Sequence, residues 1–358
     1  MVIKAIETKK IKINLYGSFT VAFGTFNSVE NVLVKITTDE GIIGFGEAAP
    51  TGPVTGETAA GVIAVLDLLR PGLVGKNPLA LDEIHALMDG AFHENPSAKC
   101  AIDLACYDII GKVMGKPVYQ VLGGGNGLVW NDVTIGIAEP EEMAREAKHY
   151  AQDLGVRIIK VKAGLDPSAD IQALTLIRRA VGDKVRLRVD ANQGYTPATA
   201  AGALEPFASL GVEAVEQCLP GWDIDGTALL RAKARGIGIM LDESIHSPRD
   251  AARSCKAGAA DMINIKLMKC GGLYPGIQIN AIAEAFGVTC MAGCMIETRL
   301  ALTAALSLVA ARHNITDADC DSFLFFDEAQ AGVTGGFTVE GDQFRLSEKA
   351  GFGVEVDF

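Results

Sequence analysis

The hydrophobic and polar positions of the first 125 residues follow two successive patterns. Residues 1–49 alternate as antiparallel strands do, and the apolar runs NVLVKITT and GIIGFGEA flank the turn-rich connector TDEG. Three later segments have the apolar spacing of helices, with Pro71, Pro78 and Pro96 as expected boundaries; they cover residues 57–70, 79–90 and 97–113. This part of the chain therefore predicts an α+β unit.

From about residue 128 the pattern changes, and strand-like apolar runs alternate with helical segments. Seven runs are clear, and an eighth lies around DADCDSFLFF, where SFLFF is the most strand-like part; the seven are VWNDVTIGI, RIIKVKAG, VRLRVDAN, VEAVEQCL, IGIMLDES, DMINIKLM and VTCMAGCM. Alternating strands and helices predict a parallel sheet, and eight such units predict a closed (β/α)8 barrel. Such a barrel builds its active site at the C-terminal ends of its strands.

Ionisable residues recur at the ends of these runs. The second run ends with Lys160 and Lys162, and the next four end with Asp190, Glu216, Asp242 and Lys266. Successive members from Lys162 onward are 24 to 28 positions apart, which is one βα unit each. The lysines of GVRIIKVKAG taken alone would also fit a solvated edge strand. Their regular recurrence, once per βα unit, instead predicts that all these side chains converge on one end of the barrel.

The three carboxylates come from adjacent strands, and such a cluster repels itself unless a cation sits in it. Oxygen ligands favour a hard ion, and three carboxylates with open positions suit Mg²⁺. Lys162 and Lys266 belong to strands four apart in a ring of eight, so they should face each other across this site. A substrate carboxylate on the metal would then have a lysine on each side of its α-carbon.

This arrangement predicts a proton transfer that inverts a carbon centre. One lysine would remove the proton next to the carboxylate, giving an enediolate whose charge the cation stabilises, and the other would return a proton on the opposite face. We expect Lys160 to lower the proton affinity of Lys162 together with the cation, or to hydrogen-bond the enediolate oxygen.

Composition limits the class of protein. The 358 residues are 49% hydrophobic and 21% charged, enough for a folded barrel and a smaller domain. A formal net charge of −12 argues against nucleic-acid or anionic-membrane partners. The 8 cysteines form no C-x-x-C pair and favour free thiols in a reducing compartment. Neither a signal peptide nor an apolar run of membrane-spanning length is evident, so we expect a cytoplasmic protein.

Several motifs together resemble the enolase superfamily, in its muconate-lactonizing-enzyme-like subgroup. They are KVK at 160–162, RVDANQGY at 188–195, VEQCLP at 215–220, LDES at 241–244, INIKLMKCGG at 263–272 and AIDLACYDIIGKVMGKPVYQVLGG at 101–124. The resemblance implies a (β/α)8-type barrel at 126–330 and an α+β capping domain, formed from residues 1–125 and completed by a C-terminal return at 331–358. It places metal ligands on Asp190, Glu216 and Asp242 and bases on Lys162 and Lys266, in agreement with the reasoning from the residues.

Within that subgroup, DADCDS at 317–322 resembles the D-x-D motif of dipeptide epimerases. The resemblance implies that Asp319 and Asp321 bind the ammonium group of a dipeptide, which two carboxylates opposite the metal suit chemically. An acidic, solvated loop is the alternative, and a strand at SFLFF would put both aspartates at its wrong end. CMIETRLAL resembles the end of strand seven in the same enzymes, which makes Glu297 either a substrate-binding residue or an acid in a first helical turn.

Specificity should come from the loop at residues 15–28, LYGSFTVAFGTFNS, which closes over the mouth in this family. It contains Phe19, Phe23 and Phe26 but no lysine or arginine, and Gly24 matches the position of an arginine in members that act on Ala-Glu. Burying a substrate carboxylate without a cation costs several kcal/mol. The sequence thus predicts an isomerase, a Mg²⁺-dependent epimerase of L,L-dipeptides that prefers a neutral or apolar C-terminal residue to an acidic one, unless another loop supplies positive charge.

Other functions share the scaffold. An o-succinylbenzoate synthase, an N-acylamino-acid racemase or a muconate cycloisomerase would not need an ammonium-binding pair, so Asp319 and Asp321 discriminate against them. A catalytically silent ligand-binding barrel is disfavoured because both opposed lysines and all three carboxylates are present. The sequence leaves open the physiological dipeptide, which lysine acts on which epimer, and whether the protein forms a homo-oligomer.

Overall fold

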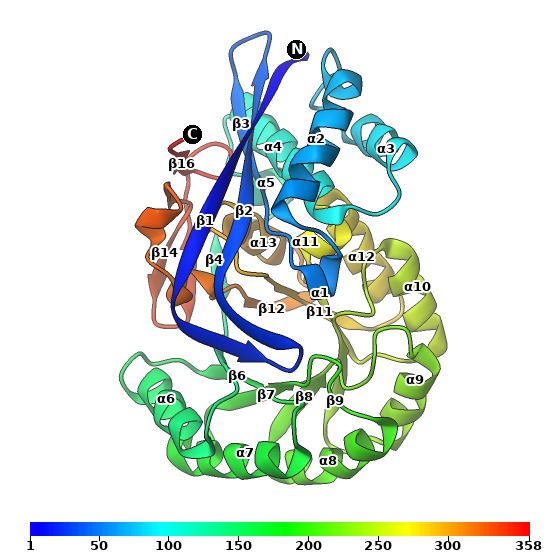
Figure 1. The fold of residues 1–358 in the computed structure, drawn as a ribbon, viewed down its shortest axis with the longest axis vertical. Helices are drawn as coiled ribbons and strands as arrows, with labels where there is room; N and C mark the ends of the chain where they lie inside the picture. Colours follow the sequence, from blue (N-terminus) through cyan, green and yellow to red (C-terminus); the bar gives the residue numbers. More distant parts are fainter.

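The computed structural model describes residues 1–358, and its N-terminal part is a three-stranded antiparallel sheet packed on helices (Figure 1). The strands follow each other along the chain: β1 (Ile3–Val21), β2 (Gly24–Thr38) and β3 (Ile43–Ala48). Five helices come next: α1 (Gly52–Thr55), α2 (Ala59–Leu73), α3 (Leu81–Ala91), α4 (Pro96–Met114) and α5 (Val118–Val121). The expected antiparallel strands and helices of this region are confirmed.

The sheet packs closely on α4 because two glycines of β3 leave room for it. A Cβ added at Gly46 would lie 1.9 Å from the Ala101 carbonyl oxygen, and one at Gly44 would lie 2.2 Å from that of Ala105. One prediction in this region is wrong: Pro71 does not end its helix but lies inside α2. The proline lies in the last turn, where its missing N–H and its ring disturb only the end of the helix.

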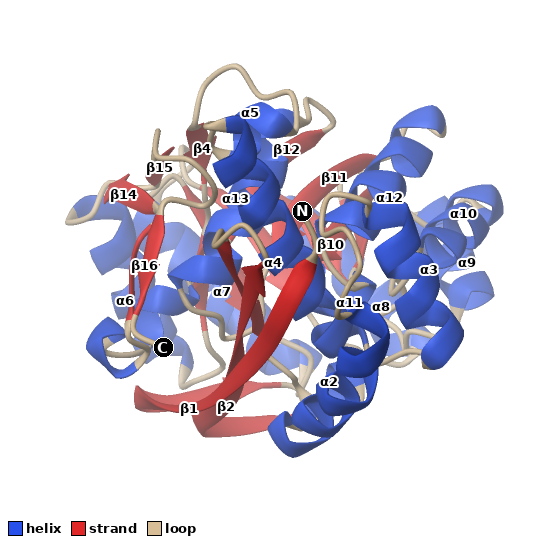
Figure 2. Cartoon of the chain, turned by 90° about the horizontal axis from the view of Figure 1, so that it is seen from above, coloured by secondary structure: helices blue, strands red, loops and turns tan.

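The rest of the chain forms an eight-stranded parallel sheet curled into a barrel, with its helices outside (Figures 1 and 2). The strands, in order around the sheet, are β5 (Val133–Ile135), β6 (Ile158–Lys162), β7 (Arg186–Asp190), β8 (Val212–Glu216), β9 (Gly238–Leu241), β10 (Met262–Lys266), β11 (Thr289–Gly293) and β12 (Ile315–Asp319). A bridge between Asn131 and Ala318 joins the two edges of the sheet. The predicted (β/α)8-type fold is confirmed.

The connecting helices follow the predicted alternation. They are α6 (Pro140–Gln152), α7 (Pro167–Val181), α8 (Pro197–Ser209), α9 (Ile224–Lys233), α10 (Pro248–Ala257), α11 (Leu267–Cys270), α12 (Leu273–Ala285) and α13 (Arg299–Ala311). Each of the α6, α7, α8 and α10 helices begins with a proline in its first turn, where no intrahelical N–H bond is lost. None of the helices in the structure is long and apolar enough to span a bilayer.

The first and the last barrel strands differ from the prediction. The run at 129–137 is two strands, because β4 (Leu128–Trp130) pairs with β15 (Gln343–Leu346) outside the barrel and only β5 joins it. SFLFF is not a strand: Ser322–Phe325 is a short 3₁₀ helix, η1, and β12 ends before it at Asp319. Phe323 instead packs edge-on against Phe337 and Phe344, so it contributes to the hydrophobic core from outside the barrel sheet.

The C-terminal residues return to the N-terminal sheet and helices. After η2 (Glu328–Gln330) they form β13 (Val333–Gly335), β14 (Phe337–Glu340), β15 and β16 (Val354–Val356). The Phe352 N–H donates to Asp108 Oδ1 of α4 at 3.0 Å, and Lys9 Nζ of β1 donates to the Asp357 carbonyl at 2.7 Å. These contacts agree with the expected return, while the domain boundaries at residues 125 and 330 stay predictions.

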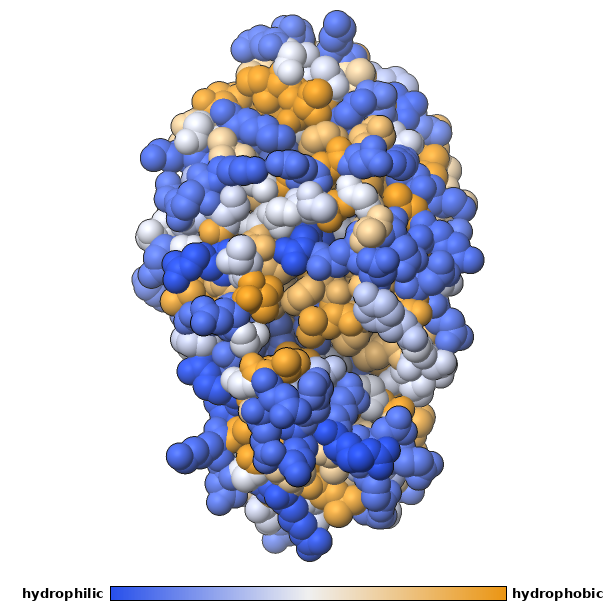
Figure 3. All heavy atoms as spheres, turned by 90° about the vertical axis from the view of Figure 1, so that its left-hand side faces the viewer, coloured by the Kyte–Doolittle hydropathy of each residue, from blue (hydrophilic) through white to orange (hydrophobic).

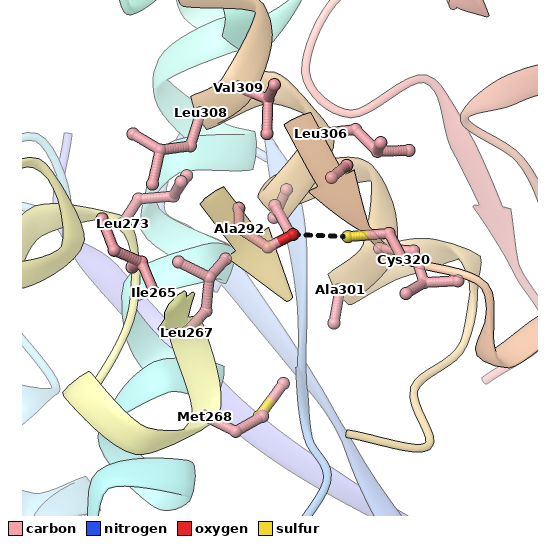
Figure 4. Close-up of a cluster of buried hydrophobic side chains, with 14 of the residues drawn as sticks. Ile265, Leu267, Met268, Leu273, Ala292, Ala301, Leu306, Leu308, Val309 and Cys320 are labelled. Atoms are coloured by element: carbon pink, nitrogen blue, oxygen red, sulfur yellow. Dashed lines mark hydrogen bonds between the residues drawn. The ribbon is translucent and has the colours of Figure 1, made fainter. Parts of the chain in front are cut away.

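One large hydrophobic core runs through both parts of the molecule. It contains 48 buried residues and joins Leu33 of β2 and Leu104 of α4 to Ile265 of β10 and Leu302 of α13. Figure 4 shows part of this cluster, in which the Cys320 thiol donates to the Ala292 carbonyl. All eight cysteines are free, as expected. The face in Figure 3 is mainly hydrophilic, with patches of hydrophobic side chains near its top and around its middle.

Candidate active site

The ionisable residues predicted to converge lie at one end of the barrel. Lys162, Asp190, Glu216 and Lys266 are the last residues of β6, β7, β8 and β10, and Asp242 follows the last residue of β9. The parallel register places Lys162 opposite Asp190 and Asp190 opposite Glu216. The C-terminal ends of these strands therefore form a single cluster of charge.

Asp190, Glu216 and Asp242 form a compact carboxylate triad. One oxygen from each lies within 4.8 Å of the others, and all three side chains are buried. Two of the carboxylates accept hydrogen bonds from neighbouring asparagines: Asn192 N–H donates to Asp190 Oδ1 at 2.9 Å, and Asn264 Nδ2 donates to Glu216 Oε1 at 2.8 Å. The triad is thus oriented by the chain itself.

Two lysines contact opposite members of the triad. Lys162 Nζ lies 2.6 Å from Asp190 Oδ2, and Lys266 Nζ lies 2.8 Å from Asp242 Oδ2. The strands that carry them are four apart in the sheet, and both side chains line the same cavity. The structure therefore brings the two proposed bases to one space from different sides of the carboxylate cluster.

Lys160 is buried beside the carboxylate triad. It is 1% exposed, does not line the cavity, and makes three ion pairs, to Asp190 (3.1 Å), Glu216 (2.8 Å) and Asp319 (2.7 Å). Burial lowers the pKa of Lys160, but the charges of Asp190, Asp319 and Glu216 outweigh it and hold the pKa well above its usual range. Lys160 is therefore a buried cation that joins the triad to Asp319.

The carboxylates do not share one ionisation behaviour. Burial raises the pKa of Glu216 to about 7, with the Asp190 charge adding to the effect. Burial also opposes ionisation of Asp242, but Lys266 and Lys269 bring its pKa well below the usual range. The pKa of Lys266 is raised in turn, because the Asp242 charge outweighs the effect of burial. Lys266 can act as a base only when the charge of Asp242 is compensated.

The residues of the triad fit a hard divalent cation. The cluster has only carboxylate oxygens as donors, without a histidine or cysteine among them. Beside it, Asn264 Oδ1, Asn192 Oδ1 and Glu243 Oε2 are buried without hydrogen-bond partners. Carboxylates and amide oxygens are the donors that Mg²⁺ takes in proteins. Asp190, Glu216 and Asp242 could therefore hold Mg²⁺ and so compensate the charge of Asp242.

A second pair of carboxylates lies elsewhere on the same cavity. Asp319 is the last residue of β12, Asp321 lies two residues further along the chain, and both line the cavity. Asp321 Oδ2 accepts from Thr134 N–H at 2.6 Å, and Asp319 Oδ1 accepts from Thr134 Oγ1 at 3.3 Å. Burial raises the pKa of Asp321 to about 7, and the charge of Asp319 adds to this. The pair is not an exposed acidic loop, and it offers a buried site for a cationic group.

The cavity itself is large and half apolar. It has a volume of about 750 Å³ including its opening to solvent, and 11 of its 22 lining residues are hydrophobic. The β1–β2 hairpin arches over the ends of the barrel strands (Figure 1) and brings Phe19, Phe23 and Phe26 to the cavity. Phe19 stacks on Phe325 with ring centroids 4.8 Å apart. Lys162 and Lys266 are the only basic side chains in the lining.

Two predicted substrate-binding residues lie outside this lining. Gly24 is exposed in the hairpin, with nothing within 4 Å of an added Cβ. Glu297 is 1% exposed just before α13, where its Oε1 accepts from Met295 N–H at 2.8 Å. Burial raises the pKa of Glu297 to about 8, so this side chain is a buried, easily protonated acid below the loop that lines the cavity.

Sequence reasoning missed several residues beside the triad. Lys269 of α11 is fully buried and pairs with Asp242 Oδ1, while Glu243 lines the cavity and accepts from Asn192 Nδ2 at 3.1 Å. Burial raises the pKa of Glu243 to about 8. The signal for them was their position, since each lies within three residues of a predicted strand-end residue.

Family models match most of the chain. Residues 5–123 match the N-terminal domain of mandelate racemase / muconate lactonizing enzyme, and residues 142–358 match the enolase C-terminal domain-like family. The hydrophobic dipeptide epimerase of Enterococcus faecalis is 42% identical over 99% of both chains. The L-Ala-D/L-Glu epimerase of Bacillus subtilis is 40% identical over 99% of this chain and 97% of its own.

Solved structures agree with the sequence matches. The dipeptide epimerase from Enterococcus faecalis, in complex with Mg and the dipeptide L-Leu-L-Tyr, superposes with a TM-score of 0.96 at 41% identity, covering 99% of this chain and 100% of that one. A substrate-liganded complex of the L-Ala-D/L-Glu epimerase from Bacillus subtilis gives 0.96 at 39% identity, covering 99% of each chain. This chain therefore belongs to the enolase superfamily, in its muconate-lactonizing-enzyme-like subgroup.

Proposed function

We propose that this protein is a Mg²⁺-dependent dipeptide epimerase. It would invert the α-carbon of the C-terminal residue of an L,L-dipeptide whose side chain at that position is neutral and apolar. The observation that carries the proposal is one cavity lined by Lys162, Lys266 and Asp242 and also by Asp319 and Asp321. The relatives named above, which are dipeptide epimerases, support the dipeptide epimerase activity.

The reaction follows from what each group of side chains can do. Asp319 and Asp321 bind the substrate ammonium and so fix the dipeptide along the cavity. Lys162 and Lys266 lie on different sides of the reacting carbon; the neutral lysine takes the α-proton, and the protonated one donates a proton to the opposite face. When bound by Asp190, Glu216 and Asp242, Mg²⁺ supplies positive charge that stabilises the substrate carboxylate as it gains negative charge.

Lys160 has a structural part in this scheme. Its ion pairs to Asp190, Glu216 and Asp319 connect the metal triad with one of the two ammonium-binding carboxylates. A buried ammonium shared by three carboxylates fixes their relative positions, so Lys160 is proposed to hold the two ends of the substrate site at a constant separation. Its side chain is 1% exposed and does not line the cavity.

The lining supports a preference for an apolar side chain. Phe19, Phe23, Phe26, Val29 and Ile296 are among its hydrophobic residues. Both lysines of the lining are paired with triad carboxylates, which leaves no cation for an acidic substrate side chain. Burying such a carboxylate unpaired costs several kcal/mol.

The test compares dipeptides and follows the α-proton. With Mg²⁺ present, we expect epimerisation of L-Ala-L-Leu, L-Ala-L-Phe and L-Leu-L-Tyr, with deuterium from D₂O entering only the C-terminal α-position. N-acetylated L-Ala-L-Leu, which lacks the ammonium, is the matched control and should react far more slowly. Absence of exchange with every free dipeptide would refute the activity. A strong preference for Ala-Glu in kcat/KM would refute the specificity alone. Cytoplasmic location stays a prediction from the sequence.

A further inference from the structure

Gln217 combines a strained backbone with complete burial. It follows Glu216 directly, is 1% exposed, and has φ of 39°, in the left-handed region that side chains other than glycine seldom adopt. Such strain persists only where surrounding interactions fix the residue. A glutamine has no special tolerance of this conformation, so the reason for its presence must lie in what its side chain does.

The side chain of Gln217 joins the end of β8 to the end of β9. Its Oε1 accepts from the backbone N–H of Asp242 at 2.9 Å and of Ser244 at 3.1 Å. Its Nε2 donates to the Leu219 carbonyl at 2.8 Å and to Ser244 Oγ at 2.9 Å. Every amide hydrogen and both oxygen lone pairs are thus used, and one of the four bonds is to the backbone of a triad residue, Asp242.

The backbone of Gln217 extends the same frame to the other neighbours. Its N–H donates to the Met240 carbonyl of β9 at 2.9 Å, and its carbonyl accepts from Gln193 N–H, beyond the end of β7, at 2.7 Å. One residue therefore connects the three strand ends that carry Asp190, Glu216 and Asp242. Its side chain fixes the backbone of Asp242, and its own peptide group directly follows Glu216.

We propose that Gln217 is a positioning residue that sets the spacing of the carboxylate triad and thereby its selectivity for Mg²⁺ over Ca²⁺. The proposal rests on the proposed metal site. Mg²⁺ requires near-ideal octahedral geometry with short oxygen distances, whereas Ca²⁺ accepts longer distances and irregular coordination. A frame that prevents the triad from widening favours the smaller ion. The strained φ at Gln217 is the cost of placing the amide where it can span two strands.

The experiment measures Mg²⁺ and Ca²⁺ dissociation constants by isothermal titration calorimetry, without substrate. Gln217→Gly removes the bridging amide and relieves the strained φ. Gln193→Gly is the matched control, because Gln193 also has positive φ, of 67°, in the adjacent loop, but the hydrogen bond of its side chain is to Gly221 N–H and not to a triad residue. We expect Gln217→Gly to weaken Mg²⁺ binding by about 10- to 100-fold, as is typical for residues that orient ligands. Ca²⁺ binding should weaken less.

Each outcome has one meaning. A loss of Mg²⁺ over Ca²⁺ preference in Gln217→Gly, with the preference kept in Gln193→Gly, supports the proposal. An unchanged Mg²⁺ affinity, an equal loss for both ions, or the same effect in Gln193→Gly overturns it. If Gln217→Gly does not fold, Gln217→Asn, which tolerates positive φ but is too short to span both strands, is judged against Gln193→Asn by the same criteria. Absence of Mg²⁺ binding to the unchanged protein would instead overturn the proposed metal site, and this proposal with it.

Discussion

Glu297 gives a prediction whose magnitude follows from the structure. Its carboxyl is 1% exposed, Oε1 accepts from Met295 N–H, and Oε2 has no partner. Burial raises its pKa from 4.5 to about 8, so the folded protein keeps this carboxyl protonated at a pH where the unfolded chain ionises it. The stabilisation from the neutral acid is complete below about pH 4.5 and is lost as the pH rises through 8.

The perturbation is Glu297→Gln, which keeps the acceptor for Met295 N–H and cannot ionise. Because the pKa of this carboxyl is higher in the folded than in the unfolded state, its ionisation lowers the free energy of unfolding of the unchanged protein by about 3–4 kcal/mol between pH 5 and pH 8. The variant has no carboxyl at this position, so its free energy of unfolding does not fall for this reason. Relative to the unchanged protein, the variant should therefore gain about that much stability over the same interval.

The assay is urea unfolding of both proteins in EDTA at pH 5 and pH 8, so that other titrating groups cancel in the difference. Glu205→Gln, on the exposed side of α8, is the control and should show no pH-dependent difference. If the difference between Glu297→Gln and the unchanged protein is the same at both pH values, Glu297 does not change its ionisation on folding and the reasoning is refuted.

Three further predictions concern the metal, the bases and the packing of β3. Removal of metal with EDTA should abolish epimerisation and Mg²⁺ should restore it, and Asp190→Asn, Glu216→Gln and Asp242→Asn should each lower kcat/KM by at least about 100-fold; full activity of the metal-free enzyme would contradict this. Lys162→Ala should lose α-proton exchange in D₂O from one epimer and Lys266→Ala from the other, measured by NMR; wild-type exchange in both variants would place the bases elsewhere. Gly46→Ala should lower the free energy of unfolding by about 1–3 kcal/mol or more, because its Cβ would lie 1.9 Å from the Ala101 carbonyl oxygen, whereas Gly17→Ala, with nothing within 4 Å, is the control; equal thermal midpoints of the two variants would show that β3 and α4 can separate without cost.

The barrel and the convergence of charge were predictable because both depend on periodic signals. Lys162, Asp190, Glu216 and Lys266 recur once per βα unit, and a parallel barrel turns that recurrence into proximity. The last strand was harder to recognise: ITDAD has one large apolar residue, and β12 is defined by its pairing with β11, which no local pattern encodes. The position of Lys160 was unpredictable for a related reason, since its contact with Asp319 joins residues 159 positions apart.

The side chains that orient the triad were also beyond local reasoning. Asn264, Lys269 and Gln217 gain their importance from which carboxylate or backbone group they contact, and those contacts cross between strands. These residues lie near predicted strand ends, but that position did not indicate which carboxylate or backbone group each side chain would contact. The cavity position of Asp319 and Asp321 came from the family resemblance, since the hydrophobicity of SFLFF pointed to the wrong strand.

The β1–β2 hairpin has a consequence for how such enzymes diversify. Phe19, Phe23 and Phe26 lie within eight consecutive residues, more than 130 positions before Lys162. Because these side chains reach the cavity from a projecting hairpin, mutations there can change the shape of the substrate pocket while every strand end stays intact. Natural selection can therefore explore new substrates through one short stretch of the gene, and a library restricted to codons 19–26 would sample the same changes in the laboratory.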